Sequence, residues 1–118
     1  MASISVVINT ATSGPFNVAQ LFAGNTYSGA VTVPPATPLQ PQSKPLYMSI
    51  QADPANGSEL VYVGDENIAP ATAGAAGQVL VAGATTQVQN VEQAIAQRYV
   101  SASANGAVLH IEVLGGFQ

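Results

Sequence analysis

Apolar and polar residues alternate along much of the chain with the two-residue period of a half-buried β-strand. Residues 3–9 and 46–52 show this alternation most clearly, with β-branched or other apolar side chains on one face. In the second segment, Tyr47 lies on the polar side. Shorter segments of this kind lie at residues 30–33, 59–64, 78–82 and 86–89. The pattern predicts a chain built mainly of short strands.

Turn-forming residues join some of these strands into predicted hairpins. Asp, Pro, Asn, Gly and Ser are concentrated in residues 53–58, so we expect the flanking strands to pair antiparallel across a longer loop. Asn105-Gly106 favours a type I′ turn and predicts a closing hairpin. Its apolar face would comprise Val100, Ala102, Ala104, Ala107, Leu109 and Ile111. Its mostly polar face would comprise Tyr99, Ser101, Ser103, Val108, His110 and Glu112.

Helical signals are few. Residues 16–23 stay open between helix and strand, because their apolar residues fit helical spacing but the segment is short. Asn90 and Gln93 form a capping-box pattern, which predicts one helical turn over residues 91–97.

Five of the eight prolines lie within twelve positions: Pro34, Pro35, Pro38, Pro41 and Pro45. Proline lacks the amide hydrogen that a strand ladder needs, and it favours extended, polyproline-like backbone. We therefore interpret residues 34–45 as an exposed loop or arm. Together with the strand pattern, this predicts one all-β domain over residues 1–118. The expected fold is a small antiparallel β-sandwich, jelly-roll-like or immunoglobulin-like, with a proline-rich arm and at most one short helical turn.

The composition excludes several classes of protein. Two basic residues stand against six acidic ones, for a net charge of −4, so no basic patch exists for nucleic acid or an anionic membrane. No apolar run approaches the ~20 residues of a transmembrane helix, and no signal-peptide pattern is visible at the N-terminus. The absence of cysteine excludes disulfides and thiolate chemistry.

Charged residues make up only 7% of the chain, against about 25% in an average soluble domain. Neutral polar side chains must therefore supply the solubility. A surface with so little charge suits a protein whose faces are largely covered by neighbours. The other interpretation is a low-charge sequence without functional meaning.

His110 is the one histidine and thus the one side chain that ordinarily titrates near neutral pH. The predicted hairpin places it near Ser101 and Glu112, but such a Ser–His–acid set on a flat sheet face lacks a nucleophile elbow and an oxyanion hole. We therefore predict no catalytic residue and interpret His110 as a strand histidine facing a partner. Tyr47 and Tyr99, on the predicted polar faces, are further contact candidates.

Acidic side chains gather in two loops, at Asp65-Glu66-Asn67 and between Asp53 and Glu59. Such oxygen ligands suit Ca²⁺, but neither loop has the spacing of an EF-hand. We expect solvated turn residues there and predict no metal and no cofactor. A structural cation near Asp65-Glu66 stays open.

A series of motifs follows the chain from its centre to its C-terminal part. The run Leu46–Asp53 is a strand with a polar turn, and the later Leu60-Val61-Tyr62-Val63-Gly64-Asp65 is a strand with a Y-V-G-D/N end. Residues 77–83 approximate a G-x-x-L-x-x-G segment, and residues 98–113 a closing hairpin. Over residues 46–114 this series resembles a pattern in small virion proteins of tailed bacteriophages.

This resemblance implies a non-enzymatic structural component of a virion, foremost a capsid decoration (cement) protein that binds and stabilises the head shell. Its partners would be the major capsid protein or other virion proteins. It would be made in the host cytoplasm and reside on the capsid surface, as a homo-oligomer for which a trimer is one option. The candidate contact residues are Pro34, Pro35, Pro38, Pro41, Tyr47, Tyr99 and His110. The alternatives are a head–tail connector, tail or fibre-associated protein, and a carbohydrate-binding or adhesion module.

Overall fold

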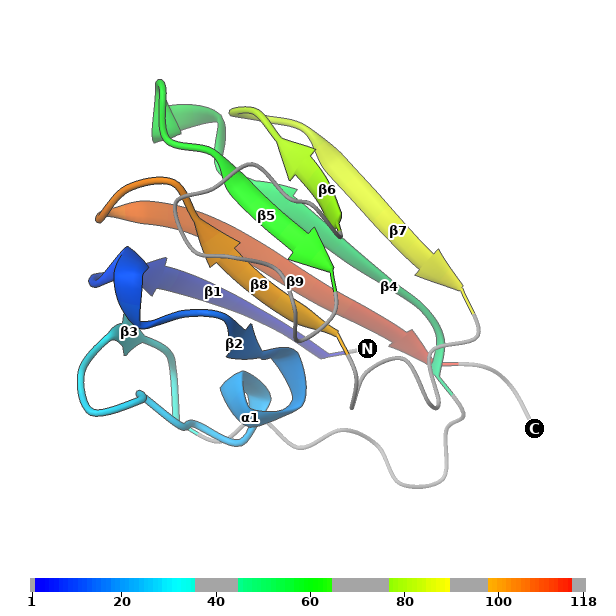
Figure 1. Cartoon of the computed structure of the whole chain (residues 1–118). Coiled ribbons are helices and arrows are strands. Elements are labelled where there is room, and N and C mark those ends of the chain that lie inside the picture. The colour runs from blue at the N-terminus through cyan, green and yellow to red at the C-terminus, as the bar shows by residue number, and fades with distance from the viewer. Residues whose placement is uncertain (1, 36–44, 65–76, 90–97, 116–118) are drawn as a thin grey trace.

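Two antiparallel β-sheets pack face to face in the computed structural model, which describes residues 2–35, 45–64, 77–89 and 98–115 (Figure 1). In order across the five-stranded sheet lie β3 (Val31–Thr32), β1 (Ala2–Ile8), β9 (Ala107–Gly115), β4 (Pro45–Ala52) and β7 (Thr85–Gln89). In order across the four-stranded sheet lie β2 (Phe16–Asn17), β8 (Tyr99–Ala102), β5 (Val61–Gly64) and β6 (Gly77–Leu80). This architecture confirms the predicted small all-β sandwich.

The core lies between the sheets and follows the alternation read from the sequence. In the five-stranded sheet, register pairs Ile4 with Ile111 and Val6 with Leu109, so the apolar side chains of neighbouring strands share the inner face. The fully buried side chains of this face include Val6, Ile8, Met48, Ile50, Leu109 and Ile111. The alternation therefore positions the polar residues of the same strands on the outer face.

The two hairpins predicted around residues 53–58 and around Asn105-Gly106 are wrong, because the two strands of each lie in opposite sheets. β4 pairs with β7 and β9, whereas β5 pairs with β6 and β8. The segment between them contains a single 3₁₀ turn, η2 (Pro54–Asn56), and carries the chain from one sheet to the other. Turn chemistry identified the reversal, but it did not distinguish a hairpin from a crossing between sheets.

The Asn105-Gly106 turn also crosses between sheets, from β8 to β9. A type I′ turn needs positive φ at both central residues, and here only Gly106 has it, at 91°. Instead, the Asn105 side chain accepts a hydrogen bond from the Ala11 amide at 2.8 Å, and the Gly106 amide donates to the Ile8 carbonyl at 2.7 Å. These long-range bonds fix the turn to the start of another crossing, beside the 3₁₀ turn η1 (Ala11–Ser13).

The ambiguous segment 16–23 contains both structures. After the two residues of β2, helix α1 (Val18–Phe22) begins at Asn17, whose side-chain oxygen accepts a hydrogen bond from the Gln20 amide at 3.1 Å. Its apolar residues, placed at helical spacing, are buried against the sandwich. The helical turn predicted over residues 91–97 lies outside the described residues, as does segment 36–44 of the proline-rich arm.

Candidate functional site

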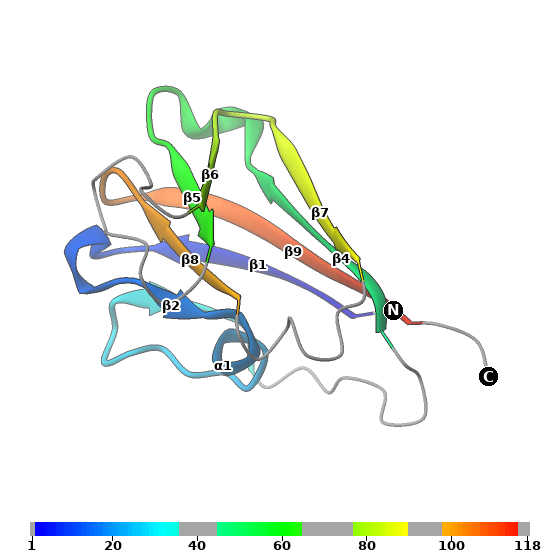
Figure 2. The same ribbon diagram turned by 45° about the vertical axis from the view of Figure 1, so that its right-hand side comes forward.

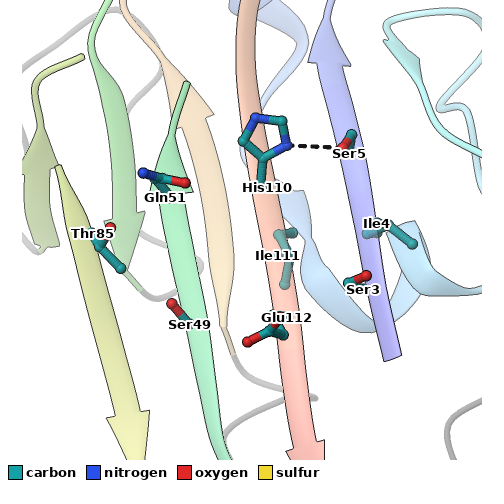
Figure 3. A pocket seen from close by; sticks show the side chains of 9 residues that line it. All are labelled: Ser3, Ile4, Ser5, Ser49, Gln51, Thr85, His110, Ile111 and Glu112. Carbon is teal, nitrogen blue, oxygen red and sulfur yellow. Dashed lines mark hydrogen bonds between the residues drawn. The ribbon is translucent and has the colours of Figure 1, made fainter. Parts of the chain in front are cut away.

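A shallow groove of about 370 Å³ runs over the outer face of the five-stranded sheet (Figure 3). It crosses strands β1, β9, β4 and β7. Its polar lining consists of Ser3, Ser5, Ser49, Gln51, Thr85, His110 and Glu112. We refer to these seven residues as the polar groove.

Strand register arranges the groove residues in two rows across the sheet. One row runs Ser5, His110, Gln51, Thr85. The next runs Ser3, Glu112, Ser49 and continues to Gln87, which lies outside the polar groove. Residues directly opposite each other in an antiparallel pair share a face and lie close enough to interact. The result is a regular array of hydroxyl and amide groups around one imidazole and one carboxylate.

His110 is held at both ring nitrogens by partners from other elements. Its Nδ1 lies 2.8 Å from Ser5 Oγ on β1, and its Nε2 lies 2.7 Å from Asp53 Oδ2 at the end of β4 (Figure 3 shows the first contact). An ionised carboxylate only accepts, so Nε2 carries the proton that it donates to Asp53. In the neutral ring, Nδ1 then accepts the Ser5 hydroxyl proton. The histidine is fixed while its side chain stays 38% exposed.

Asp53 belongs to the turn that follows β4. Its Oδ1 accepts a hydrogen bond from the Ala55 amide at 2.7 Å, which starts η2. The hydrogen bond from the Ala55 amide has the larger effect on the Asp53 carboxyl, and the hydrogen bond from His110 the next. Together they hold the pKa of Asp53 below its ordinary value of 3.8. The same carboxylate therefore caps a turn and orients the imidazole.

Ser5, His110 and Asp53 share the residue types of a hydrolytic triad but differ from it in arrangement. In serine hydrolases the serine meets Nε2 and the acid meets Nδ1, whereas these contacts are reversed here. The serine of an α/β-hydrolase also stands on a sharp turn beside an oxyanion hole, while Ser5 lies within a strand, directly opposite His110. Cross-strand pairing accounts for the contact between Ser5 and His110. Ser5 and Asp53 together hold the imidazole in one orientation.

The sequence placed His110 correctly on an outward position beside Glu112, but its other predicted neighbour was wrong. Ser101 lies on β8, in the opposite sheet, and is fully buried. The actual partners, Ser5 and Asp53, lie 105 and 57 positions away along the chain. The outward position of Ser5 in its strand was visible in the sequence. The pairing of that strand with β9 was not.

The other contact candidates that the structure describes, Pro34, Pro35 and Tyr99, do not line this groove. Tyr99 lies on β8, opposite Gly64 and Asn17 in the four-stranded sheet. The prediction that it shares a face with His110 is therefore wrong. Pro34 and Pro35 follow the short edge strand β3 after one intervening residue, Val33. The backbone of Tyr47 belongs to β4, while its side chain lies outside the described part of the chain, as do Pro38 and Pro41.

Metal-ligating groups do not converge among the described residues: no set of three or more His, Asp or Glu side chains lies together. In the loop after β4, Asp53 binds Ala55 and His110, and the Asn56 amide binds the Val108 backbone. The Asp65-Glu66 cluster lies outside the described residues. Among the helices of the described segments, none has the length and apolar character needed to cross a membrane.

Comparisons of the chain with protein-family models, with curated proteins and with solved structures found no match. Its function is therefore inferred from the chemistry of the groove and from the sequence.

Proposed function

We propose that this chain is a non-enzymatic structural protein of a tailed-bacteriophage virion, and that it binds the head shell as a decoration protein. The observation that carries the proposal is the polar groove, an ordered array of mostly uncharged polar side chains on the outer face of the five-stranded sheet. The sequence resemblance over residues 46–114 supplies the virion context.

Short neutral side chains suit contact with another protein surface. Hydroxyl and amide groups cost less to desolvate than charges, and they can exchange water for hydrogen bonds with a partner. Side chains of a strand ladder also lose little freedom on binding, because the sheet already fixes their backbone. The side chains of the polar groove therefore suit a surface that binds another protein.

His110 gives this face a fixed central group. Its two hydrogen bonds, to Ser5 and Asp53, hold the ring in one orientation before any partner arrives. Preorganised groups increase affinity because less conformational entropy is lost on binding. On a shell that presents many identical sites, modest contacts of this kind add up when the bound protein is oligomeric.

The test has two parts. Quantitative mass spectrometry of purified particles measures the copy number relative to the major shell subunit. Hundreds of copies support decoration, and about a dozen would move the protein to the neck or tail. Absence from the particle would overturn the virion role and direct attention to binding of glycans.

The second part asks whether the groove is the contact face. We expect Ser49→Arg, which places a bulky cation in the groove, to weaken binding to shells lacking the protein by on the order of tenfold or more. Thr12→Arg is the matched control, because Thr12 is exposed and lies in η1, outside the groove. Equal binding by both variants would exclude the groove as the contact face.

A further inference from the structure

In the part of the chain that the structure describes, both sheets end on one side of the sandwich. β6 is the last strand of the four-stranded sheet and β7 the last strand of the five-stranded sheet. Figure 1 shows the two strands next to each other, and Figure 2 shows that they diverge from the short turn that joins them, each at the end of its own sheet. They are also linked, because the Thr86 hydroxyl donates a hydrogen bond to the Gln78 side-chain oxygen. The two edges therefore form one surface, which we call the β6/β7 edge.

This edge lacks the features that keep sheet edges apart in monomeric proteins. Natural edges carry lysine, other inward charges, proline or bulges, which prevent pairing with another chain. Residues 77–89 contain no charged residue and no proline. Within the described segments, the large apolar side chains left exposed are Val79 and Val81, at 42% and 58%. Val79 lies on β6, and Val81 directly follows it.

We propose that the β6/β7 edge pairs with the same edge of a second copy of this chain. β6 would align antiparallel with β6 of the second copy about a two-fold axis near Val79, and the two β7 strands would face each other in the other sheet. Val79 would then meet its own counterpart. On either side of it the contacts would be reciprocal, with Gln78 of each copy opposite Leu80 of the other, as a two-fold interface requires. The backbone groups at the ends of both sheets would gain ladder hydrogen bonds, and the valines would be covered.

A second copy fits this surface better than an unrelated strand. The sandwich and the Thr86–Gln78 bond fix the spacing between the two edges, and another copy presents the same spacing. The distribution of charge also favours a second copy. The chain carries a net charge of −4, so copies repel wherever charges meet, and the uncharged 77–89 segment avoids that repulsion.

Because the chain has no cysteine, single-cysteine variants test the geometry directly. Opposed residues of an antiparallel pair have Cα atoms about 4.5–5.5 Å apart, within the range that a disulfide spans. We expect Val79→Cys to form a disulfide-linked dimer rapidly under mild oxidation. Thr12→Cys, also at an exposed position but outside the edge, should cross-link only slowly. Equal rates for the two variants would overturn the proposal.

Sedimentation equilibrium of the unmodified chain gives a second measurement. We expect a concentration-dependent rise towards twice the 11.9 kDa chain mass. Val79→Lys places like charges opposite each other and should weaken self-association by on the order of tenfold or more, while Thr12→Lys should not. A chain that stays monomeric at every concentration, or an unaffected Val79→Lys variant, would refute the pairing. Both experiments use the purified chain alone, so their outcome is independent of the virion role.

Discussion

Two serines near the end of β8 have opposite roles in stability. Ser101 Oγ is fully buried and has no hydrogen-bond partner among the described residues, whereas Ser103 Oγ accepts a hydrogen bond from the Leu60 amide at 2.8 Å. A buried polar group without a partner keeps its full desolvation cost, and removing it can stabilise a protein. Removing Ser103 Oγ leaves the Leu60 amide without this acceptor.

We therefore expect the same substitution to change stability in opposite directions. Ser101→Ala should raise the free energy of unfolding by about 1 kcal/mol, and Ser103→Ala should lower it by about 1 kcal/mol. Urea denaturation of both variants, followed by far-UV circular dichroism, measures the two changes. A loss of stability in Ser101→Ala equal to that in Ser103→Ala would contradict this account of the buried hydroxyl.

Asp53 makes stability depend on pH in the acid range. Its pKa is lowered by the Ala55 amide and by His110, so the folded state prefers the ionised carboxylate. The resulting stabilisation is present above the ordinary Asp pKa of 3.8 and is lost as pH falls through the lower folded-state pKa.

Asp53→Asn should therefore be less stable than the unmodified protein at neutral pH, and the difference should shrink below about pH 4. Thermal unfolding across this range measures the effect. Glu59→Gln is the control, because among the described residues the Glu59 carboxylate has no hydrogen bond. A difference for Asp53→Asn that stays constant down to strongly acidic pH would rule out the carboxylate as its source.

At the scale of elements, one side chain holds the crossing between β4 and β5 against β9. Asn56 is 7% exposed, and its amide donates to the Val108 carbonyl at 2.8 Å and accepts from the Val108 amide at 2.9 Å. The side chain thus pairs with β9 much as a strand residue would. It attaches η2 to the sheet where β4 ends.

We expect Asn56→Ala to lower the free energy of unfolding by about 2–3 kcal/mol, since both backbone groups of Val108 lose a partner in a half-buried place. Chemical denaturation gives the value. Ser58→Ala, two residues along the same turn and exposed, should change it by less than about 0.5 kcal/mol. Similar effects for the two variants would mean that Asn56 acts only as a turn residue.

Strand positions were predictable from the sequence, whereas strand partners were not. Alternation identifies which residues face the core, and it does so whether two strands pair in one sheet or face each other across a sandwich. Val100 and Ile111 illustrate this: both are buried as predicted, but from opposite sheets. A local turn such as Asn105-Gly106 suits either connection, and distant bonds to Ala11 and Ile8 decide between them.

For the candidate site, too, the position of the central residue was predictable from the sequence, but its hydrogen-bond partners were not. The outward position of His110 follows from its own strand, while its partners depend on which strand lies beside it. The burial of Ser101 could not be read from alternation either, because β8 is covered on both faces, as its neighbour β5 is. Alternation with a two-residue period predicts that one face of a strand is exposed to solvent. In β8 and β5 nearly every side chain is buried, so the prediction does not hold there.

At the scale of the whole molecule, the scarcity of charge determines how the protein should bind. The net charge is −4, and the polar groove contains one carboxylate and one histidine among neutral side chains. Salt weakens contacts between exposed charges, with a screening length of about 10 Å at 0.1 M, but affects neutral hydrogen bonds little. Contacts through this groove should therefore be insensitive to ionic strength.

We expect the affinity of the purified chain for phage shells to change by less than about threefold between 50 and 500 mM salt, since charged steering contributes little to a neutral face. Co-sedimentation with shells over a salt series measures this. Glu112→Gln, which removes the carboxylate of the groove, should leave the salt dependence unchanged. A steep loss of binding with salt would show that charged residues outside the groove carry the contact, whereas no binding at any salt concentration would count against the shell as partner.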